Sequence, residues 1–189
     1  MKNIFASLFG LLLVMSIVSC DDYLDINDDP NNPSSVPATL TLPAAQMTIA
    51  TTLSSDYAVL GGIWAQHWTQ SHVASQYRDE DRYDLTLLDY QVSWSELYAG
   101  ALIDLRKIEA EAVASGNWNL NLQAVCLTAF TYQMLVDWYS DVPYAQSLQG
   151  EGGVVAPQYQ PGSEIYADLV ARLDAALAQD FSGDGVTQI

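Results

Sequence analysis

The 189-residue chain is poor in positive charge and in cysteine. Only 6 residues are Lys or Arg against 23 that are Asp or Glu, so the formal net charge at pH 7 is −17. This balance excludes a basic patch that holds a nucleic-acid backbone, and it opposes contact with an anionic membrane surface unless the chain is tethered. Two cysteines, Cys20 and Cys126, are too few for a disulfide framework. We interpret Cys126, which lies in an apolar run, as a small buried core residue.

The chain also lacks the short motifs of common catalytic sites. It has no nucleophile elbow, no His-Glu zinc helix and no phosphate-binding loop. Its 2 histidines, His67 and His72, have no cysteine or carboxylate at the spacing that would complete a zinc site. The mixed charges of residues 78–82 are typical of a solvated turn rather than of an acid–base pair. We therefore expect no metal, no cofactor and no enzymatic activity.

One apolar run stands at the N-terminus. Lys2 precedes a hydrophobic stretch that closes on Ile17-Val18-Ser19-Cys20. The stretch is shorter than the ~20 residues that span a bilayer, and no later segment is apolar enough to do so. We predict a lipoprotein signal peptide over residues 1–19, with Cys20 as the lipidated N-terminus of the mature protein. The alternative is a plain secretory signal that happens to contain a cysteine.

Residues 20–36 have the composition of a flexible acidic tether. Asp21, Asp22, Asp25, Asp28 and Asp29 are followed by the Pro30-Asn31-Asn32-Pro33 segment, in which no regular element is expected. The alternation of acidic residues resembles the start of a calcium loop. We reject that site because proline stands where the loop requires glycine.

Helical periodicity dominates residues 37–189. We expect a helix over about 43–53 with Pro43 in its first turn, and a second helix that is capped by Asp56 and runs through Trp64 and Trp68. The clearest apolar stripe, in residues 91–114, consists of Trp94, Leu97, Tyr98, Ala101, Leu102, Leu105, Ile108 and Ala112. A short turn at 115–117 and a helix over about 120–139 complete an antiparallel hairpin.

A long loop and one more helix follow. Ser140 to Pro143 break the hairpin's second helix, and residues 146–162 have the Gly and Pro content of an exposed connection. Ser163 is predicted to cap a last helix with its apolar stripe on Ile165, Leu169, Leu173 and Leu177, and with Asp168 and Arg172 as an i,i+4 pair. The prediction is an all-α fold of stacked helix pairs of the tetratricopeptide type with long loops, although no internal repeat is readable.

Tryptophan and tyrosine supply most of the aromatic side chains. The chain has 5 Trp and 11 Tyr against 4 Phe, and such rings suit sugar-stacking surfaces and half-wet interfaces. Core packing is the preferred interpretation of Trp64 and Trp94, whose neighbours on the helix are apolar. Trp68 and Tyr77, which polar residues flank, are the candidate ligand contacts.

Five segments together resemble the SusD/RagB family of outer-membrane lipoproteins. They are Cys20-Asp21-Asp22-Tyr23-Leu24-Asp25 with the Asn-Pro segment after it, Trp64-Ala65-Gln66-His67-Trp68, Gln76-Tyr77-Arg78-Asp79, Asp137-Trp138-Tyr139-Ser140-Asp141-Val142-Pro143-Tyr144, and Glu164-Ile165-Tyr166-Ala167-Asp168-Leu169. The fourth segment is the most specific, although the family commonly has glycine at the position of Ser140. Family members are also two or three times longer, so the chain resembles their N-terminal part, a solenoid truncated at its C-terminus.

The resemblance implies a lipid-anchored, surface-exposed protein of the cell outer membrane. Such a protein lies as a lid on a SusC-like TonB-dependent transporter and captures oligosaccharides, or in some members peptides, for import. Two alternatives remain. The chain could be a truncated or assembly-only partner of the transporter without a ligand of its own, or a fragment of a surface glycoside hydrolase, for which no carboxylate pair is evident.

Overall fold

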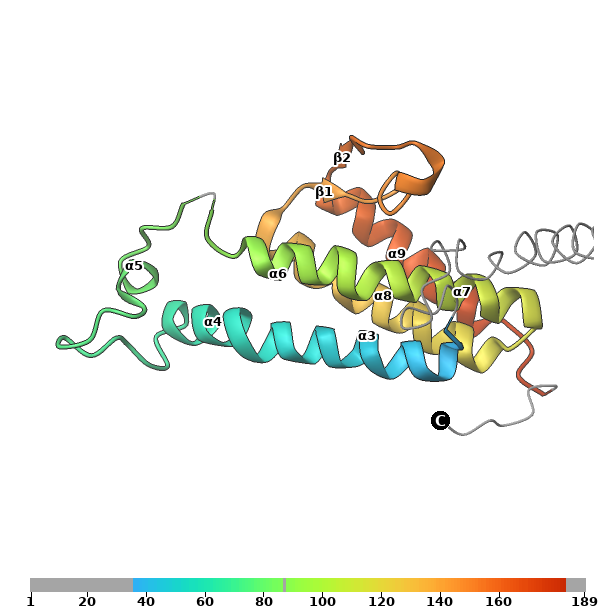
Figure 1. Cartoon of the computed structure of the whole chain (residues 1–189), viewed down its shortest axis with the longest axis horizontal. Helices are drawn as coiled ribbons and strands as arrows, with labels where there is room; N and C mark the ends of the chain where they lie inside the picture. The colour runs from blue at the N-terminus through green and yellow to red at the C-terminus, as the bar shows by residue number, and fades with distance from the viewer. Residues whose placement is uncertain (1–35, 87, 183–189) are drawn as a thin grey trace, which may run out of the picture. The chain divides into compact units, whose positions relative to one another are not determined.

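The computed structural model describes residues 36–86 and 88–182, and within them the fold is all-α (Figure 1). The predicted signal peptide, Cys20 and nearly all of the predicted tether lie outside these ranges. The helices are α3 (Ala38–Thr52), η1 (Leu53–Tyr57), α4 (Ala58–Trp64), α5 (Arg78–Asp81), α6 (Gln91–Ser95), η2 (Glu96–Leu102), α7 (Ile103–Ser115), α8 (Trp118–Tyr139), η3 (Gly150–Gly152) and α9 (Gly162–Leu177). Two short strands, β1 (Val142–Pro143) and β2 (Tyr159–Gln160), pair in antiparallel fashion.

The first helix is longer than the sequence predicted. α3, the π-helical turn η1 and α4 form one continuous helix, where we expected two helices with a break near Asp56. Pro43 lies inside α3 rather than in its first turn. Asp56 caps no helix: its carboxylate accepts a hydrogen bond from Ser93 of α6. Asp56 therefore marks a contact with a neighbouring helix, which the sequence alone does not distinguish from a helix break.

The predicted hairpin over residues 91–139 is confirmed. α6, η2 and α7 form one continuous helix that ends at Gly116, whose left-handed backbone (φ 69°) is a conformation that glycine adopts without steric cost. Asn117 then caps α8 by accepting a hydrogen bond from the backbone N–H of Leu120. A turn this short makes α8 run antiparallel to α7.

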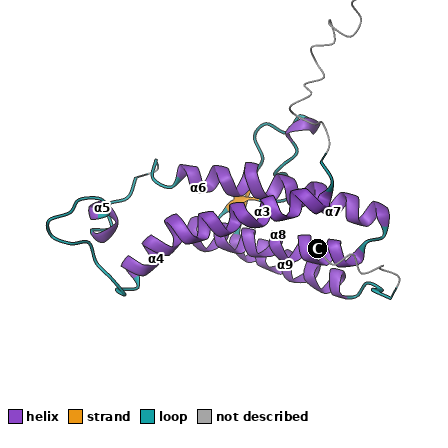
Figure 2. Ribbon diagram, turned by 60° about the horizontal axis from the view of Figure 1, so that its bottom comes forward, coloured by secondary structure: helices purple, strands orange, loops and turns teal. Residues whose placement is uncertain are grey.

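The core lies between antiparallel helices, which Figure 2 shows from a second direction. α3 packs on η2 and α7, α7 packs on α8, and α8 packs on α9. A Cβ atom added to Gly100 of η2 would lie 3.1 Å from the side chain of Thr48 of α3, and one added to Gly162 would lie 3.0 Å from the carbonyl oxygen of Ser140. The helices approach each other closely at both glycines. The largest fully buried side chains are Leu42, Leu97, Leu102, Leu105, Ile108, Leu135 and Ile165, each worth about 1.5–3 kcal/mol of burial. This up-and-down stacking agrees with the predicted helix-pair architecture.

Two predictions about single residues in this part of the fold are wrong. Ser163 does not cap α9, because the helix already begins at Gly162 and Pro161 takes the cap position. Cys126 is exposed rather than buried. It lies on the outer face of α8 with Gln123 and Phe130, three and four residues away. An apolar run within one helix does not reveal which of its faces points to solvent.

Two long connections project from the helices. Residues 65–90 carry α5 beyond the end of α4, and residues 140–161 carry β1, η3 and β2 (Figure 1). The second connection confirms the long loop expected before the last helix. Within residues 36–86 and 88–182, no helix combines the length and the hydropathy that crossing a bilayer requires.

Candidate functional site

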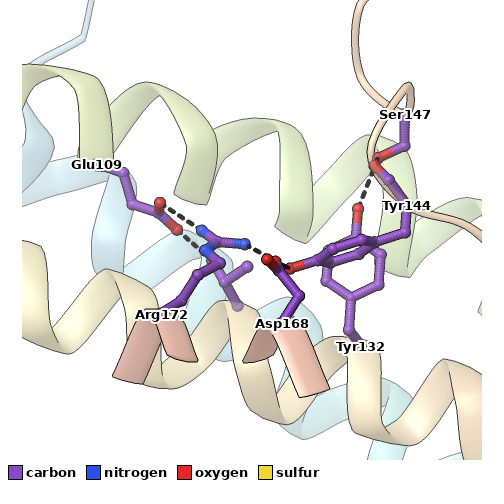
Figure 3. A network of polar contacts seen from close by, with 7 residues as sticks. Glu109, Tyr132, Tyr144, Ser147, Asp168 and Arg172 are labelled. Atoms are coloured by element: carbon purple, nitrogen blue, oxygen red, sulfur yellow. Dashed lines mark hydrogen bonds and ion pairs between the residues drawn. The ribbon is translucent and has the colours of Figure 1, made fainter. Parts of the chain in front are cut away.

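A polar cavity of about 400 Å³ lies between α7, α8, α9 and the loop after β1. Arg172 of α9 is one of its lining residues and lies between Glu109 and Asp168 in a network of polar contacts (Figure 3). The guanidinium donates to Glu109 of α7 over 2.7 Å and to the hydroxyl of Tyr144 over 3.2 Å. Tyr144 in turn donates to Asp168, one turn before Arg172 on α9. The predicted i,i+4 pair of Asp168 and Arg172 is therefore replaced by a link in which Tyr144 lies between them.

The polar groups of this network satisfy one another. Thr128 donates to the second oxygen of Glu109 over 2.7 Å, and the buried hydroxyls of Tyr132 and Ser147 are 2.6 Å apart. Burial and the hydrogen bond to Asp168 raise the pKa of Tyr144 to about 12, so its hydroxyl keeps its proton at neutral pH. A closed set of bonds of this kind orders the structure and leaves few groups for a ligand.

The network fixes the position of the loop between β1 and α9. Tyr144 follows β1 directly, and Pro143 in β1 pairs with Tyr159 in β2. Tyr98 of η2 also donates its hydroxyl to the carbonyl of Pro143 over 2.7 Å. These contacts place the ring of Tyr159 beside that of Trp94, with 6.4 Å between their centroids and 21° between their planes.

Trp94 and Tyr159 belong to a second cavity of about 600 Å³, which we name the aromatic cavity. Its lining aromatic side chains are Trp64, Tyr90, Trp94, Trp138, Tyr139 and Tyr159. They come from α4, the end of the 65–90 connection, α6, the end of α8 and β2. Residues that are distant in sequence thus meet at one end of the helix stack.

The rings of the aromatic cavity hold one another in place. Trp94 packs edge to face on Tyr139, with 4.9 Å between centroids, and Trp138 packs in the same way on Tyr90 with 5.5 Å between centroids. Such pairs add about 0.5–1.5 kcal/mol to the burial of their surfaces. Tyr139 also donates its hydroxyl to the carbonyl of Tyr90 over 3.3 Å. The lining is therefore a set of preformed platforms rather than of loose side chains.

Glu80 of α5 fastens the long 65–90 connection to the rim of this cavity. Its carbonyl accepts a hydrogen bond from the indole N–H of Trp64 over 3.0 Å, and its carboxylate accepts one from the hydroxyl of Tyr90 over 3.0 Å. The Trp64 ring also stacks on Tyr83, with 5.3 Å between centroids. Burial, and next the bond to Glu80, raise the pKa of Tyr90.

Three carboxylates line the same cavity: Asp89, Asp137 and Asp141. One oxygen of Asp89 accepts from the backbone N–H and the hydroxyl of Thr86, and one oxygen of Asp137 accepts from the hydroxyl of Tyr166 over 2.5 Å. Aromatic faces with a few carboxylate oxygens around them suit a polyhydroxylated ligand, whose apolar C–H face stacks while its hydroxyls donate.

Of the tryptophans considered in the sequence analysis, some lie where the sequence predicted and others do not. Trp94 is half-buried against the core as expected, but Trp64 is 42% exposed, so its interpretation as a core residue is wrong. Trp68 lies after α4 has ended, with its ring against Gly62 and its N–H directed to the carbonyl of Val59 at 3.4 Å.

Neither Trp68 nor Tyr77 lines the aromatic cavity. The backbone N–H of Tyr77 donates to Gln70 over 2.7 Å, and its hydroxyl accepts from Gln76 over 2.9 Å. Both candidates lie on the connection that borders the cavity, and their contact with a ligand stays a prediction.

Sequence reasoning missed Tyr90, Trp138 and Tyr159 as site residues. The signal that could have found Trp138 is the segment from Asp137 to Tyr144, which concentrates aromatic and acidic residues where a helix ends. Tyr159 carries no such signal because its place depends on strand pairing with β1. In the part of the chain that the structure describes, no three His, Cys, Asp or Glu side chains are arranged to hold a metal ion.

Comparison with known proteins agrees with this architecture. A model of the SusD-like family, described as "Starch-binding associating with outer membrane", matches residues 30–188. No curated protein matches the chain. Because the family model covers most of the sequence and the helix pairs conform to it, the chain belongs to the SusD-like family.

Proposed function

We propose that this protein is a lipid-anchored, surface-exposed protein of the outer membrane that binds an oligosaccharide in the aromatic cavity and passes it to a SusC-like TonB-dependent transporter. The observation that carries the proposal is the convergence of six aromatic rings and three carboxylates on one cavity of about 600 Å³. The description of the family as starch-binding and associated with the outer membrane supports a glucan as the ligand.

The chemistry of the lining suits a sugar. The axial C–H groups of a pyranose form an apolar face that stacks on a flat ring, and Trp94 and Tyr159 offer two nearly parallel rings in the lining of the cavity. Tyr159 is 63% exposed, so its ring is accessible without any rearrangement of the core. The carboxylates around the rings accept hydrogen bonds from sugar hydroxyls, which fixes the orientation of the ligand.

Binding without catalysis is part of the proposal. A glycosidase needs one protonated and one ionised carboxyl group that face each other across the bond to be cleaved. Asp89 and Asp137 instead accept hydrogen bonds from Thr86 and Tyr166. We expect no reducing ends to be released from starch, and their steady release by the purified protein would contradict this part.

Affinity electrophoresis in gels cast with and without soluble starch tests ligand binding. The wild-type protein is expected to be retarded by starch, and Tyr159→Ala is expected to migrate almost freely because the exposed ring is lost while the core is untouched. Trp118→Ala is the control, because Trp118 begins α8 about 30 Å along the helix from Trp138. Wild-type migration that starch leaves unchanged contradicts glucan binding.

The alternative function is assembly with the transporter without capture of a ligand. Co-purification distinguishes it from oligosaccharide binding. A transporter that co-purifies with a protein that starch does not retard supports assembly alone. The anchor is tested by Cys20→Ala, which is expected to move the protein from the membrane fraction to the soluble fraction, because lipid is the only anchor in the proposal. Cys20→Ala that stays in the membrane fraction contradicts lipid anchoring.

A further inference from the structure

We propose that the aromatic cavity selects its oligosaccharide by charge, favouring a sugar that carries an amine over the neutral sugar and disfavouring one that carries a carboxylate. The inference rests on the proposed function of the same cavity and adds the class of sugar that it takes.

The lining of the cavity carries charge of one sign. Asp89, Asp137 and Asp141 line it, and none of the five Lys and Arg residues of the described ranges does. Arg106 and Arg172 line the polar cavity on another side of α8, where Arg172 is paired with Glu109. A sugar carboxylate in the aromatic cavity would therefore meet three like charges and no guanidinium or ammonium partner.

The carboxylates keep acceptor positions for a ligand. Asp141 is exposed, and among the described residues no hydrogen bond to its carboxylate is found. Asp137 uses Oδ1 for Tyr166, and Asp89 uses Oδ2 for Thr86, so each has a second oxygen that these bonds do not occupy. A cationic donor finds up to three anionic acceptors around one cavity, and charge-assisted hydrogen bonds are roughly twice as strong as neutral ones.

The aromatic rings add to the same preference. An ammonium group within ~6 Å of the face of Trp or Tyr is attracted by the ring quadrupole, and Trp94 and Tyr159 present such faces beside the carboxylates. A carboxylate over the same faces is repelled. The rings and the carboxylates therefore both favour a sugar with an amine over a neutral sugar, and a neutral sugar over one with a carboxylate.

Calorimetric titration of the purified chain with three matched probes tests the inference. The probes are maltotetraose, its derivative with 6-amino groups and its derivative with 6-carboxylate groups, all at physiological ionic strength so that distant charges are screened. We expect the amine to bind about tenfold more tightly than maltotetraose and the carboxylate about tenfold more weakly. Asp141→Asn is expected to reduce the ratio of the affinity for the 6-amino derivative to the affinity for the 6-carboxylate derivative by about threefold or more.

The control variant is Asp174→Asn, which makes the same change in net charge on an exposed position of α9 away from the cavity. Asp174→Asn is expected to leave the ratio of these two affinities unchanged. Equal affinities for all three probes overturn charge selection while leaving glucan binding in place. The same conclusion follows if Asp141→Asn and Asp174→Asn change the ratio of the affinities equally. Absence of binding by all three probes overturns the proposed function, and charge selection with it.

Discussion

Arg172 of α9 and Glu109 of α7 form an ion pair with 2.7 Å between Nη2 and Oε2, although 63 residues separate them in the sequence. Their side chains are 31% and 19% exposed, so the pair is partly shielded from water. The same guanidinium also donates to Tyr144, which follows the strand that positions Tyr159. One arginine thus joins the last helix to the core and to the loop beside the aromatic cavity.

Arg172→Met is expected to lower the free energy of unfolding by about 1–3 kcal/mol, between the values for exposed and buried ion pairs. The cause is the loss of both donors, which leaves one oxygen of Glu109 without its charged partner. Urea denaturation measures the change. Arg78→Met on the exposed α5 is the control and is expected to change stability by less than about 0.5 kcal/mol. Equal effects of the two substitutions would contradict a structural role for the network.

Two hydrogen-bonded tyrosines predict a loss of stability at alkaline pH. Burial first, and then the bond to Asp168, raise the pKa of Tyr144 from 10.0 to about 12, and the hydrogen bond to Asp137 raises that of Tyr166 to about 12. The unfolded chain releases these protons above pH 10.0 while the folded chain retains them, so the folded state binds more protons. The stabilisation is complete below pH 10.0 and is lost as the pH rises toward about 12.

Denaturation curves at several pH values in this window, with tyrosinate absorbance as the second readout, measure that loss. Tyr144→Phe is expected to make the stability less steeply dependent on pH between 10.0 and about 12, because one retained proton is removed. A pH dependence that is identical in this variant would show that Tyr144 is not held neutral by the fold.

Adjacent glycines of α4 give opposite predictions. A Cβ atom added to Gly62 would lie 2.4 Å from the ring of Trp68, whereas one added to Gly61 meets nothing within 4 Å. Gly61→Ala is expected to stabilise the helix by up to about 1 kcal/mol, because alanine has the better helix propensity. Gly62→Ala is not expected to stabilise the protein in this way, because the new methyl group displaces the Trp68 ring. The displaced ring is expected to increase the quenching of tryptophan fluorescence by acrylamide. Identical stability and quenching in both variants would contradict the packing of Trp68 on Gly62.

The sequence predicted those features that depend on local periodicity. The stripe from Leu97 to Ala112 is buried as expected, because side chains three and four residues apart share one face of a helix. Asp56 was misread as a cap because its partner, Ser93, lies 37 residues away.

The candidate site depends even more on distant contacts. Its rings come from positions as far apart as Trp64, Trp94 and Tyr159. Only the packing of α3 on η2, within the two continuous helices that carry Trp64 and Trp94, and the pairing of β1 with β2 bring them together. Each of these rings taken alone has the sequence context of an ordinary half-buried aromatic residue. Spacing along the chain could therefore indicate aromatic richness but not the cavity.

The most direct test of ligand binding in the aromatic cavity is the affinity of Trp94→Ala for maltotetraose, measured by calorimetry beside the wild type and Trp118→Ala. The account predicts saturable binding by the wild type and by Trp118→Ala, and affinity at least about tenfold weaker in Trp94→Ala, which corresponds to about 1.4 kcal/mol. Circular dichroism first establishes that all three proteins are equally helical. Equal affinity of Trp94→Ala and the wild type would place the ligand elsewhere and contradict the account.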